Sequence, residues 1–193
     1  MNSSWTASLC VTLLVLAAPF APQCAADDFK LTPEQMQALE GTRKGFGKGR
    51  KLQAEIERML GQAAETNRVQ LALSLAITVA EKWPGEAADA VGKLVQHLPA
   101  QAVPLIHAAL KAAPQEALEI TRAAMSASPT NSVRLATAAI QIAPAQGNAI
   151  LEAARWRAPK ELHPQLEQLK ASLPAAVVAP PSRVPRVENP LAR

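Results

Sequence analysis

The residues with the clearest chemical potential form a basic, glycine-rich run, GTRKGFGKGRK, from Gly41 to Lys51. A phosphate-binding P-loop has four residues between its first glycine and a Gly-Lys pair, which is followed by Ser or Thr. Here five residues separate Gly41 from the pair that begins at Gly47, and Gly49 occupies the place of the hydroxyl residue. The run is therefore not predicted to bind nucleotides.

Five positive side chains of this run remain as candidate binding residues. They are Arg43, Lys44, Lys48, Arg50 and Lys51. A flexible basic segment can be attracted to an anionic lipid or polymer by charge alone. One interpretation of the run is therefore a weak contact of this kind. We favour a solvated linker, because a nucleic-acid footprint needs more charge and more aromatic surface than this run has. No specific nucleic acid is expected as a partner.

The histidines do not form a catalytic or metal-binding constellation. No two of His97, His107 and His163 lie three or four residues apart, the spacing that places two metal ligands on one helix face. Both cysteines, Cys10 and Cys24, are expected to leave with an N-terminal leader. We therefore expect no metal, no cofactor and no enzymatic activity.

Trp156 is the best single candidate for a contact residue. It stands between Arg155 and Arg157, at a position that helical periodicity places outside the buried arc. Tryptophan and arginine are the residue types most enriched at binding hot spots. The alternative is that Trp156 packs against the last helix or the C-terminal tail, and the sequence leaves both open.

Prolines define the elements that must position these residues. Seven of them recur every fifteen residues, at Pro84, Pro99, Pro114, Pro129, Pro144, Pro159 and Pro174. Repetition at a fixed period is the sequence signature of a repeat fold. Residues 54–68 and 69–83 keep the same phase without the leading proline, so eight units cover residues 54–173.

Each fifteen-residue unit has the periodicity of a helix. Counted from the proline, apolar or small residues recur at positions 4, 7, 8, 11, 12 and 15. Proline suits the first turn of a helix and disfavours helix in the residue before it. We predict one helix of about 11–12 residues per unit, ended by roughly two or three linking residues, so that neighbouring helices are antiparallel. Paired alanines at positions 10 and 11 of four units would let the helices approach closely.

Three irregularities modify this pattern. Pro104 and Pro164 lie at position 6 of their units, where a helix that began at position 1 would lose a backbone hydrogen bond, so we expect these helices to start later. Gly147, at position 4, indicates a close contact. The last unit, residues 159–173, is more charged and is predicted to cap the array.

Tandem antiparallel helix pairs resemble tetratricopeptide and HEAT-type α-solenoids in layout. The pattern AxxxAPxxAxxI over residues 84–173 is more closely similar to Ala- and Pro-punctuated helical repeats of exported bacterial proteins of unassigned function. The expected fold is all-α, an α-solenoid of short antiparallel helical hairpins with a disordered Pro-rich C-terminal tail. The resemblance implies a binding or scaffolding role and carries over no catalytic residue.

The N-terminus has the pattern of a targeting segment. Leu9 to Ala18 is an uncharged apolar run of ten residues, too short for a bilayer, which needs about 20. The small residues Cys24-Ala25-Ala26 that follow are typical of a signal-peptide cleavage site, so we expect export to the periplasm or the extracellular space. The predicted organisation is a signal peptide (1–26), an N-terminal helix and basic loop (27–51), a helical repeat domain (52–173) and a disordered Pro-rich tail (174–193).

Composition and charge complete the expectation. The chain is 49% hydrophobic and 3% aromatic, which excludes a wholly disordered chain and an aromatic-rich site. The net charge is +4: residues 43–51 carry +5 and the tail carries +2, residues 27–42 carry −3, and residues 52–173 are neutral. We predict a non-enzymatic protein-interaction or scaffolding module with an unknown protein partner. The alternative is a peripheral envelope protein that binds anionic lipid or polymer through residues 43–51.

Overall fold

The computed structural model describes residues 30–42 and 47–173, so the predictions for the signal peptide (1–26) and the tail (174–193) lie outside the described residues. The α-helices of the described part are α1 (Pro33–Thr42), α2 (Lys48–Gln62), α3 (Glu65–Lys82), α4 (Pro84–His97), α5 (Ala102–Ala112), α6 (Ala117–Ala127), α7 (Ser132–Ile142), α8 (Gly147–Arg157) and α9 (His163–Ser172). Short 3₁₀ helices precede the last five, namely η1 (Pro99–Gln101), η2 (Pro114–Glu116), η3 (Pro129–Asn131), η4 (Pro144–Gln146) and η5 (Lys160–Leu162). These residues contain no strand, and none of their helices combines the length and apolar character needed to cross a membrane.

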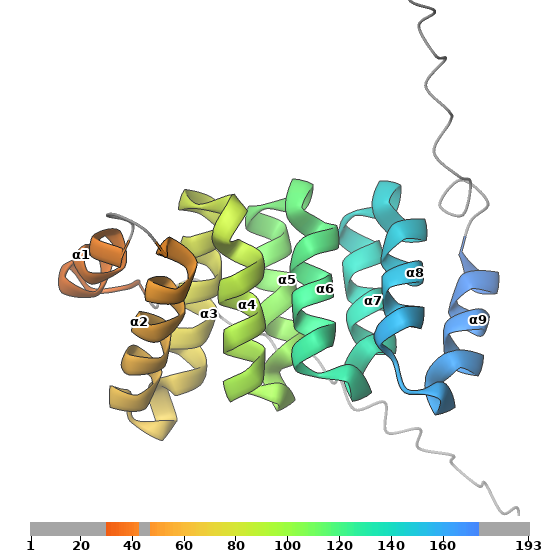
Figure 1. Ribbon diagram of the computed structural model, residues 1–193, viewed down its shortest axis with the longest axis horizontal. Helices are drawn as coiled ribbons and strands as arrows, with labels where there is room; N and C mark the ends of the chain where they lie inside the picture. The colour runs from red at the N-terminus through yellow and green to blue at the C-terminus, as the bar shows by residue number, and fades with distance from the viewer. Residues whose placement is uncertain (1–29, 43–46, 174–193) are drawn as a thin grey trace, which may run out of the picture.

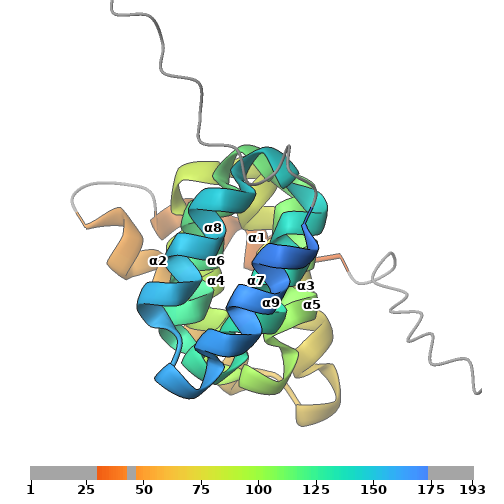
Figure 2. The ribbon, with the colours of Figure 1, turned by 90° about the vertical axis from the view of Figure 1, so that its right-hand side faces the viewer.

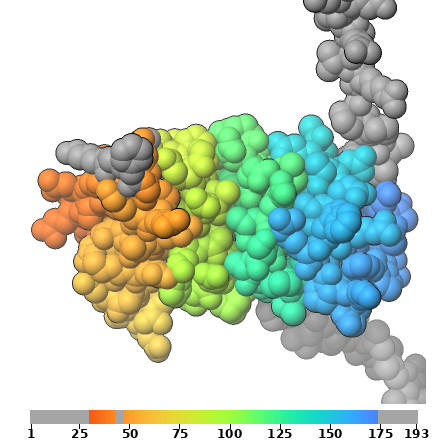
Figure 3. Space-filling view, in the orientation of Figure 1, coloured from red at the N-terminus to blue at the C-terminus, as the bar shows by residue number. Residues whose placement is uncertain are grey.

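Helices alternate between two layers, and the predicted α-solenoid is confirmed. From α2 to α9, each helix packs against the helix two places along the chain: α4 contacts α2 and α6, and α5 contacts α3 and α7. Figure 1 shows α2, α4, α6 and α8 side by side in one layer, and Figure 2 shows the second layer, α3, α5, α7 and α9, beside it. Helices are parallel within a layer and antiparallel between layers. Figure 3 shows the outer surface of the α2/α4/α6/α8 layer, which we call the even face.

One residue, not two or three, links consecutive helices in the regular part of the array. It stands at position 15, and at Leu98, Ala113, Ser128 and Ala143 its φ lies between −140° and −124° and its ψ between 63° and 75°. The following proline disfavours the α conformation at this position, which breaks the helix there. A single non-helical residue is therefore enough to reverse the chain direction.

Backbone hydrogen bonds continue through this link, which explains why it is so short. The Ala113 N–H donates to the Ala109 carbonyl of the preceding helix at 2.9 Å, and the Ala113 carbonyl accepts from the Glu116 N–H of the next unit at 3.1 Å. The same pair of bonds recurs at the other three links. Since buried peptide groups must be paired, the link can be buried as part of the core.

The late helix start expected at the two irregular prolines is confirmed. The α-helical part begins at Ala102 in α5 and at His163 in α9, so Pro104 and Pro164 lie in first turns, where no N–H partner is lost. The regular units between them also begin their α-helix at position 4, after a 3₁₀ turn that starts at the proline. A late start is thus a property of the repeat and not only of the irregular units.

The core consists of the positions that the periodicity predicts. The inward side chains of the unit that begins at Pro114 are no more than 5% exposed; they are Ala117, Ile120, Thr121, Ala124, Met125 and Ser128. The second alanine of each pair, at Ala109, Ala124, Ala139 and Ala154, is fully buried. Gly147 is also buried. At the C-terminal end Leu166 is buried, whereas Leu169 and Leu173 are only partly covered, in keeping with a terminal helix.

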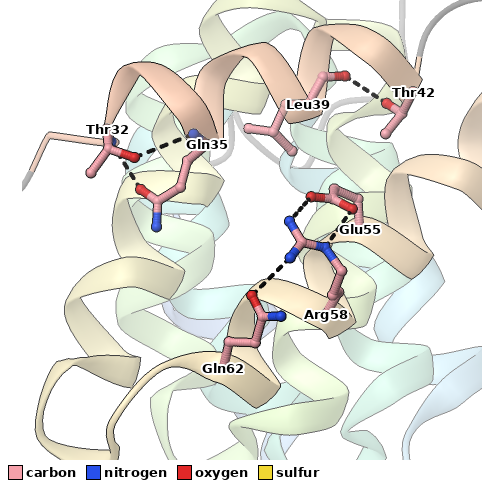
Figure 4. Close-up of polar contacts among 7 residues, drawn as sticks. All are labelled: Thr32, Gln35, Leu39, Thr42, Glu55, Arg58 and Gln62. Carbon is pink, nitrogen blue, oxygen red and sulfur yellow. Dashed lines mark hydrogen bonds and ion pairs between the residues drawn. The ribbon is translucent and has the colours of Figure 1, made fainter.

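The N-terminal helix begins with a capping box formed by Thr32 and Gln35. The Gln35 N–H donates to the Thr32 hydroxyl oxygen at 3.2 Å, and the Thr32 N–H donates to Gln35 Oε1 at 2.9 Å (Figure 4). This reciprocal pair satisfies two backbone donors. Leu39 of α1 is fully buried, and α1 packs on α2 at the N-terminal end of the array.

Glycine at position 92 allows α4 and α6 to approach closely. A Cβ at Gly92 would lie 3.3 Å from the Ala123 Cβ, whereas a Cβ at Gly61 of α2 would meet nothing within 4 Å. We expect Gly92→Val to lower the free energy of unfolding by about 1–3 kcal/mol through overpacking, and Gly61→Val to change it by less than about 0.5 kcal/mol. Urea denaturation followed by circular dichroism measures both. Equal effects of the two substitutions would contradict the close approach.

Candidate interaction face

The structure describes three of the five predicted basic residues. Arg43 and Lys44 lie outside the described residues, whereas Lys48, Arg50 and Lys51 are exposed in the first turn of α2. The prediction of a loop through Lys51 is wrong from Lys48 onward, because α2 begins there. Gly47, with φ of 76°, adopts a left-handed conformation just before the helix, which glycine does without steric cost. The buried stripe that begins at Leu52 then holds α2 in the array.

Packing near this turn explains why glycine interrupts the basic run. A Cβ at Gly49 would lie 3.0 Å from the Asp89 Oδ2 of α4, so a larger side chain would displace that carboxylate. The first turn of α2 contains no acidic residue of its own, and positive charges at a helix N-terminus oppose the helix dipole. The Asp89 carboxylate supplies negative charge to this turn from the neighbouring helix.

The three histidines belong to different helices, His97 to α4, His107 to α5 and His163 to α9. His97 Nε2 lies 3.6 Å from Glu57 Oε1, and Lys93 Nζ approaches the same oxygen at 2.5 Å. The hydrogen bond from Lys93 lowers the pKa of Glu57, with a smaller opposing effect from desolvation. These two contacts join α2 to α4. Partial burial, helped by the charge of Lys111, lowers the pKa of His107. Among the residues that the structure describes, no group of three His, Cys, Asp or Glu could hold a metal ion.

A cavity of about 300 Å³ lies near the N-terminal end, between α1, α2 and α3. Met59, Ala63 and Leu71 supply its apolar lining, and Arg58 is on its edge. The Arg58 guanidinium is already engaged, since it donates to both Glu55 oxygens, at 2.5 and 3.0 Å, and to Gln62 Oε1 at 2.8 Å (Figure 4). This arginine therefore joins neighbouring turns of α2 rather than presenting a free cation to the cavity.

Trp156 is exposed at the C-terminal end of α8. The relative exposure of Trp156 is 84%. In the described part of the chain, no other large hydrophobic side chain is exposed. It borders a groove of about 260 Å³ between α6 and α8, which we call the α6–α8 groove. The groove is lined by Leu118, Arg122, Ala149, Glu152, Ala153, Trp156 and Arg157. In the described residues, Trp156 is thus not packed against the last helix.

Arg157 fixes one side of the α6–α8 groove. Its Nε donates to the Ser126 hydroxyl of α6 at 2.8 Å, so the bond joins α8 to α6 beside Trp156. Two other arginines nearby have acidic partners: Arg122 pairs with Glu119 at 3.1 Å and Arg155 with Glu167 at 3.5 Å. The exposed carboxylate of Glu152 has no ion-pair partner among the described residues.

A second groove lies on the same face, over α2, α4 and α6. Its volume is about 380 Å³, and its lining includes the small residues Ala88, Gly92 and Ala123. Gln53 and Gln96 are among the polar residues of its wall. Both grooves belong to the even face, and both are lined by small apolar residues together with polar ones.

The basic turn of α2 and Trp156 are not brought together. Both belong to the α2/α4/α6/α8 layer, but α4 and α6 lie between their helices (Figure 1). Since helices of this layer are parallel, Lys48 at the start of α2 and Trp156 at the end of α8 lie at opposite ends of the layer. The predicted candidates therefore form two separate surfaces.

Sequence reasoning missed two side-chain amides that join alternate units. Gln146 Oε1 accepts from the Leu118 N–H at 2.9 Å, while its Nε2 donates to the Gln115 carbonyl at 3.2 Å. Asn131 Nδ2 donates to the Pro99 carbonyl at 3.3 Å. We call these contacts amide clasps; one joins η4 to η2 and the start of α6, and the other joins η3 to η1. A signal was present, because position 3 is Glu, Gln or Asn in all six proline-led units: Glu86, Gln101, Glu116, Asn131, Gln146 and Glu161.

The chain was compared with known proteins in three ways. No protein-family model, curated protein or solved structure matches it. The comparisons therefore add no residue roles to this face, and the protein is described by its structure alone, as a helical repeat with two grooves on its even face.

The clasp at Gln146 leads to a stability prediction. Gln146→Ala removes the acceptor of a helix N-terminal N–H in α6, and we expect a loss of about 1 kcal/mol in the free energy of unfolding. Gln141→Ala, at an exposed glutamine of α7, is the matched control and should change stability by less than about 0.5 kcal/mol. Thermal denaturation followed by circular dichroism compares the two. A Gln146 variant as stable as the control would show that the clasp contributes nothing.

Proposed function

We propose that this protein is a non-enzymatic helical-repeat module that binds a partner protein on its even face. One observation carries the proposal: Trp156 is 84% exposed beside the α6–α8 groove. An exposed tryptophan offers a large, rigid apolar surface and one N–H donor, a combination enriched at protein interfaces. The tandem fold supports this role, because stacked repeats present extended surfaces for binding.

The chemistry around Trp156 favours a polypeptide ligand. Ala149 and Ala153 leave room for an apolar side chain, while Arg122 and Glu152 lie on the same groove and can bind polar groups of opposite sign. Arg157 is held in place by Ser126, so part of the surface is ordered before binding. A segment with an apolar anchor flanked by charged residues would complement this arrangement.

A capture experiment tests the proposal. With the full chain as bait in the exported fraction of native cells, we expect Trp156→Ala to reduce recovery of the partner by roughly tenfold or more, since a hot spot contributes about 2 kcal/mol. Lys111→Ala, which changes an exposed residue of α5 in the other layer, is the control and should leave recovery unchanged. Quantitative mass spectrometry measures the recovered partner, and circular dichroism checks that both variants fold.

The same experiment distinguishes protein binding on the even face from the alternative function, which is binding of anionic lipid or polymer. A chain with serine in place of the five basic residues (Arg43, Lys44, Lys48, Arg50 and Lys51) should retain the partner if the even face carries recognition. If that chain instead loses its ligand, and the Trp156 variant keeps it, the protein is a peripheral envelope protein that binds anionic lipid or polymer. Binding to phosphatidylglycerol vesicles at low ionic strength then identifies the lipid case, because charge attraction is screened by salt.

We also propose that the protein is exported, on the apolar run from Leu9 to Ala18 and the small residues that end at Ala26. Expression of the full chain in a Gram-negative host should yield a mature protein in the periplasm that begins at Asp27. N-terminal sequencing of the purified protein measures this directly. A chain recovered only in the cytoplasm with residues 1–26 intact would contradict export.

A further inference from the structure

The α6–α8 groove has properties that suit a proline-rich, positively charged segment. Trp156 offers a flat apolar surface at 84% exposure, and aromatic surfaces are the usual contact for proline rings in extended peptides. Ala149 and Ala153 keep the adjoining part of the groove shallow and apolar. Glu152 adds an exposed carboxylate on the same groove.

This chain supplies such a segment. Residues 174–193, PAAVVAPPSRVPRVENPLAR, contain five prolines and three arginines against one acid. Proline holds φ near −65°, so an extended conformation costs little entropy to bind. Pro180-Pro181 is followed closely by Arg183, which places a positive charge two residues from the rings that would contact Trp156.

The length of chain after α9 matches the distance to the groove. α9 is antiparallel to α8, so its first residue lies near the end of α8 that carries Trp156, and its ten residues carry the chain about 15 Å away. Adding one helix spacing of about 8–10 Å, the path from Leu173 back to Trp156 is roughly 20–25 Å. Pro180 and Pro181 stand seven and eight residues beyond Leu173, which is roughly 22–25 Å at about 3.1 Å per residue.

We propose that residues 174–193 bind in cis to the α6–α8 groove, with Pro180-Pro181 on the Trp156 indole and Arg183 paired with Glu152. A short tether gives the segment a high effective concentration at the groove, so a modest contact is enough for substantial occupancy. The inference concerns the chain alone and does not depend on an external partner. If the proposed function also holds, a partner at Trp156 must displace this segment.

Fluorine NMR of the full chain labelled with 5-fluorotryptophan tests the contact. The chain has three tryptophans, and Trp156→Phe identifies the resonance of interest. In the double variant Pro180→Ser/Pro181→Ser we expect the Trp156 resonance to shift and its H₂O-to-D₂O isotope shift to increase about twofold as water reaches the indole. Pro190→Ser is the matched control and should leave both unchanged. These substitutions lie outside residues 47–173, which contain the helices packed around Trp83, so Trp83 should not respond.

A charge exchange tests the second contact. Glu152→Arg should reproduce the effect of the double proline variant, and adding Arg183→Glu in the same chain should restore the original resonance. The proposal is overturned if the Trp156 signal is identical in the original chain and the double proline variant. It is also overturned if the signal moves over a hundredfold dilution, because the occupant would then be a second copy. Neither result bears on the capture experiment, so the two proposals can fail separately.

Discussion

The restriction that a proline places on the residue before it is the constraint on which the array depends. At position 15 this residue leaves the α conformation, yet its N–H and carbonyl both remain hydrogen-bonded, as at Ala113. The chain therefore reverses direction within one residue and buries the turn. The units of α5, α6, α7 and α8 begin with the same turn, so these helices have 11 residues each and their alanine pairs lie at equal heights. Close packing within each layer depends on that equality of height.

Much of the fold could be predicted because its determinants are local. The period, the buried positions and the late start of α5 all depend on where proline can sit in a helix, and these residues are visible in the sequence. The start of α2 could not be predicted in this way. Four glycines between Gly41 and Gly49 indicate a loop, and only packing of Leu52 and its neighbours against the array makes the segment helical from Lys48. Tertiary contacts here override a weak local propensity.

The candidate site was predictable in part. Periodicity places Trp156 outside the buried arc, but its exposure depends on how far α9 extends over α8, which no local pattern specifies. The amide clasps were missed for a different reason. Gln146 stands beside a turn, where a polar residue is expected in any case, and its partners lie 28 to 32 residues away. Only the alignment of units by their prolines brings the position 3 side chains into register as a set.

Because successive helices alternate between the two layers, the side of the molecule on which a residue lies depends on how many units precede it. Removing the fifteen-residue unit that begins at Pro114 would join Ala113 directly to Pro129, so the junction would keep the same proline turn. Yet every later helix would change layer, and the tryptophan would move to the opposite surface, away from the helices that now form its groove. Removing two units would shorten the array and preserve its sidedness. An insertion or deletion therefore keeps each later helix in its layer only if it adds or removes thirty residues. The smallest repeat in the sequence is one helix of fifteen residues. The smallest unit that can be gained or lost without exchanging the two layers is the hairpin of two helices.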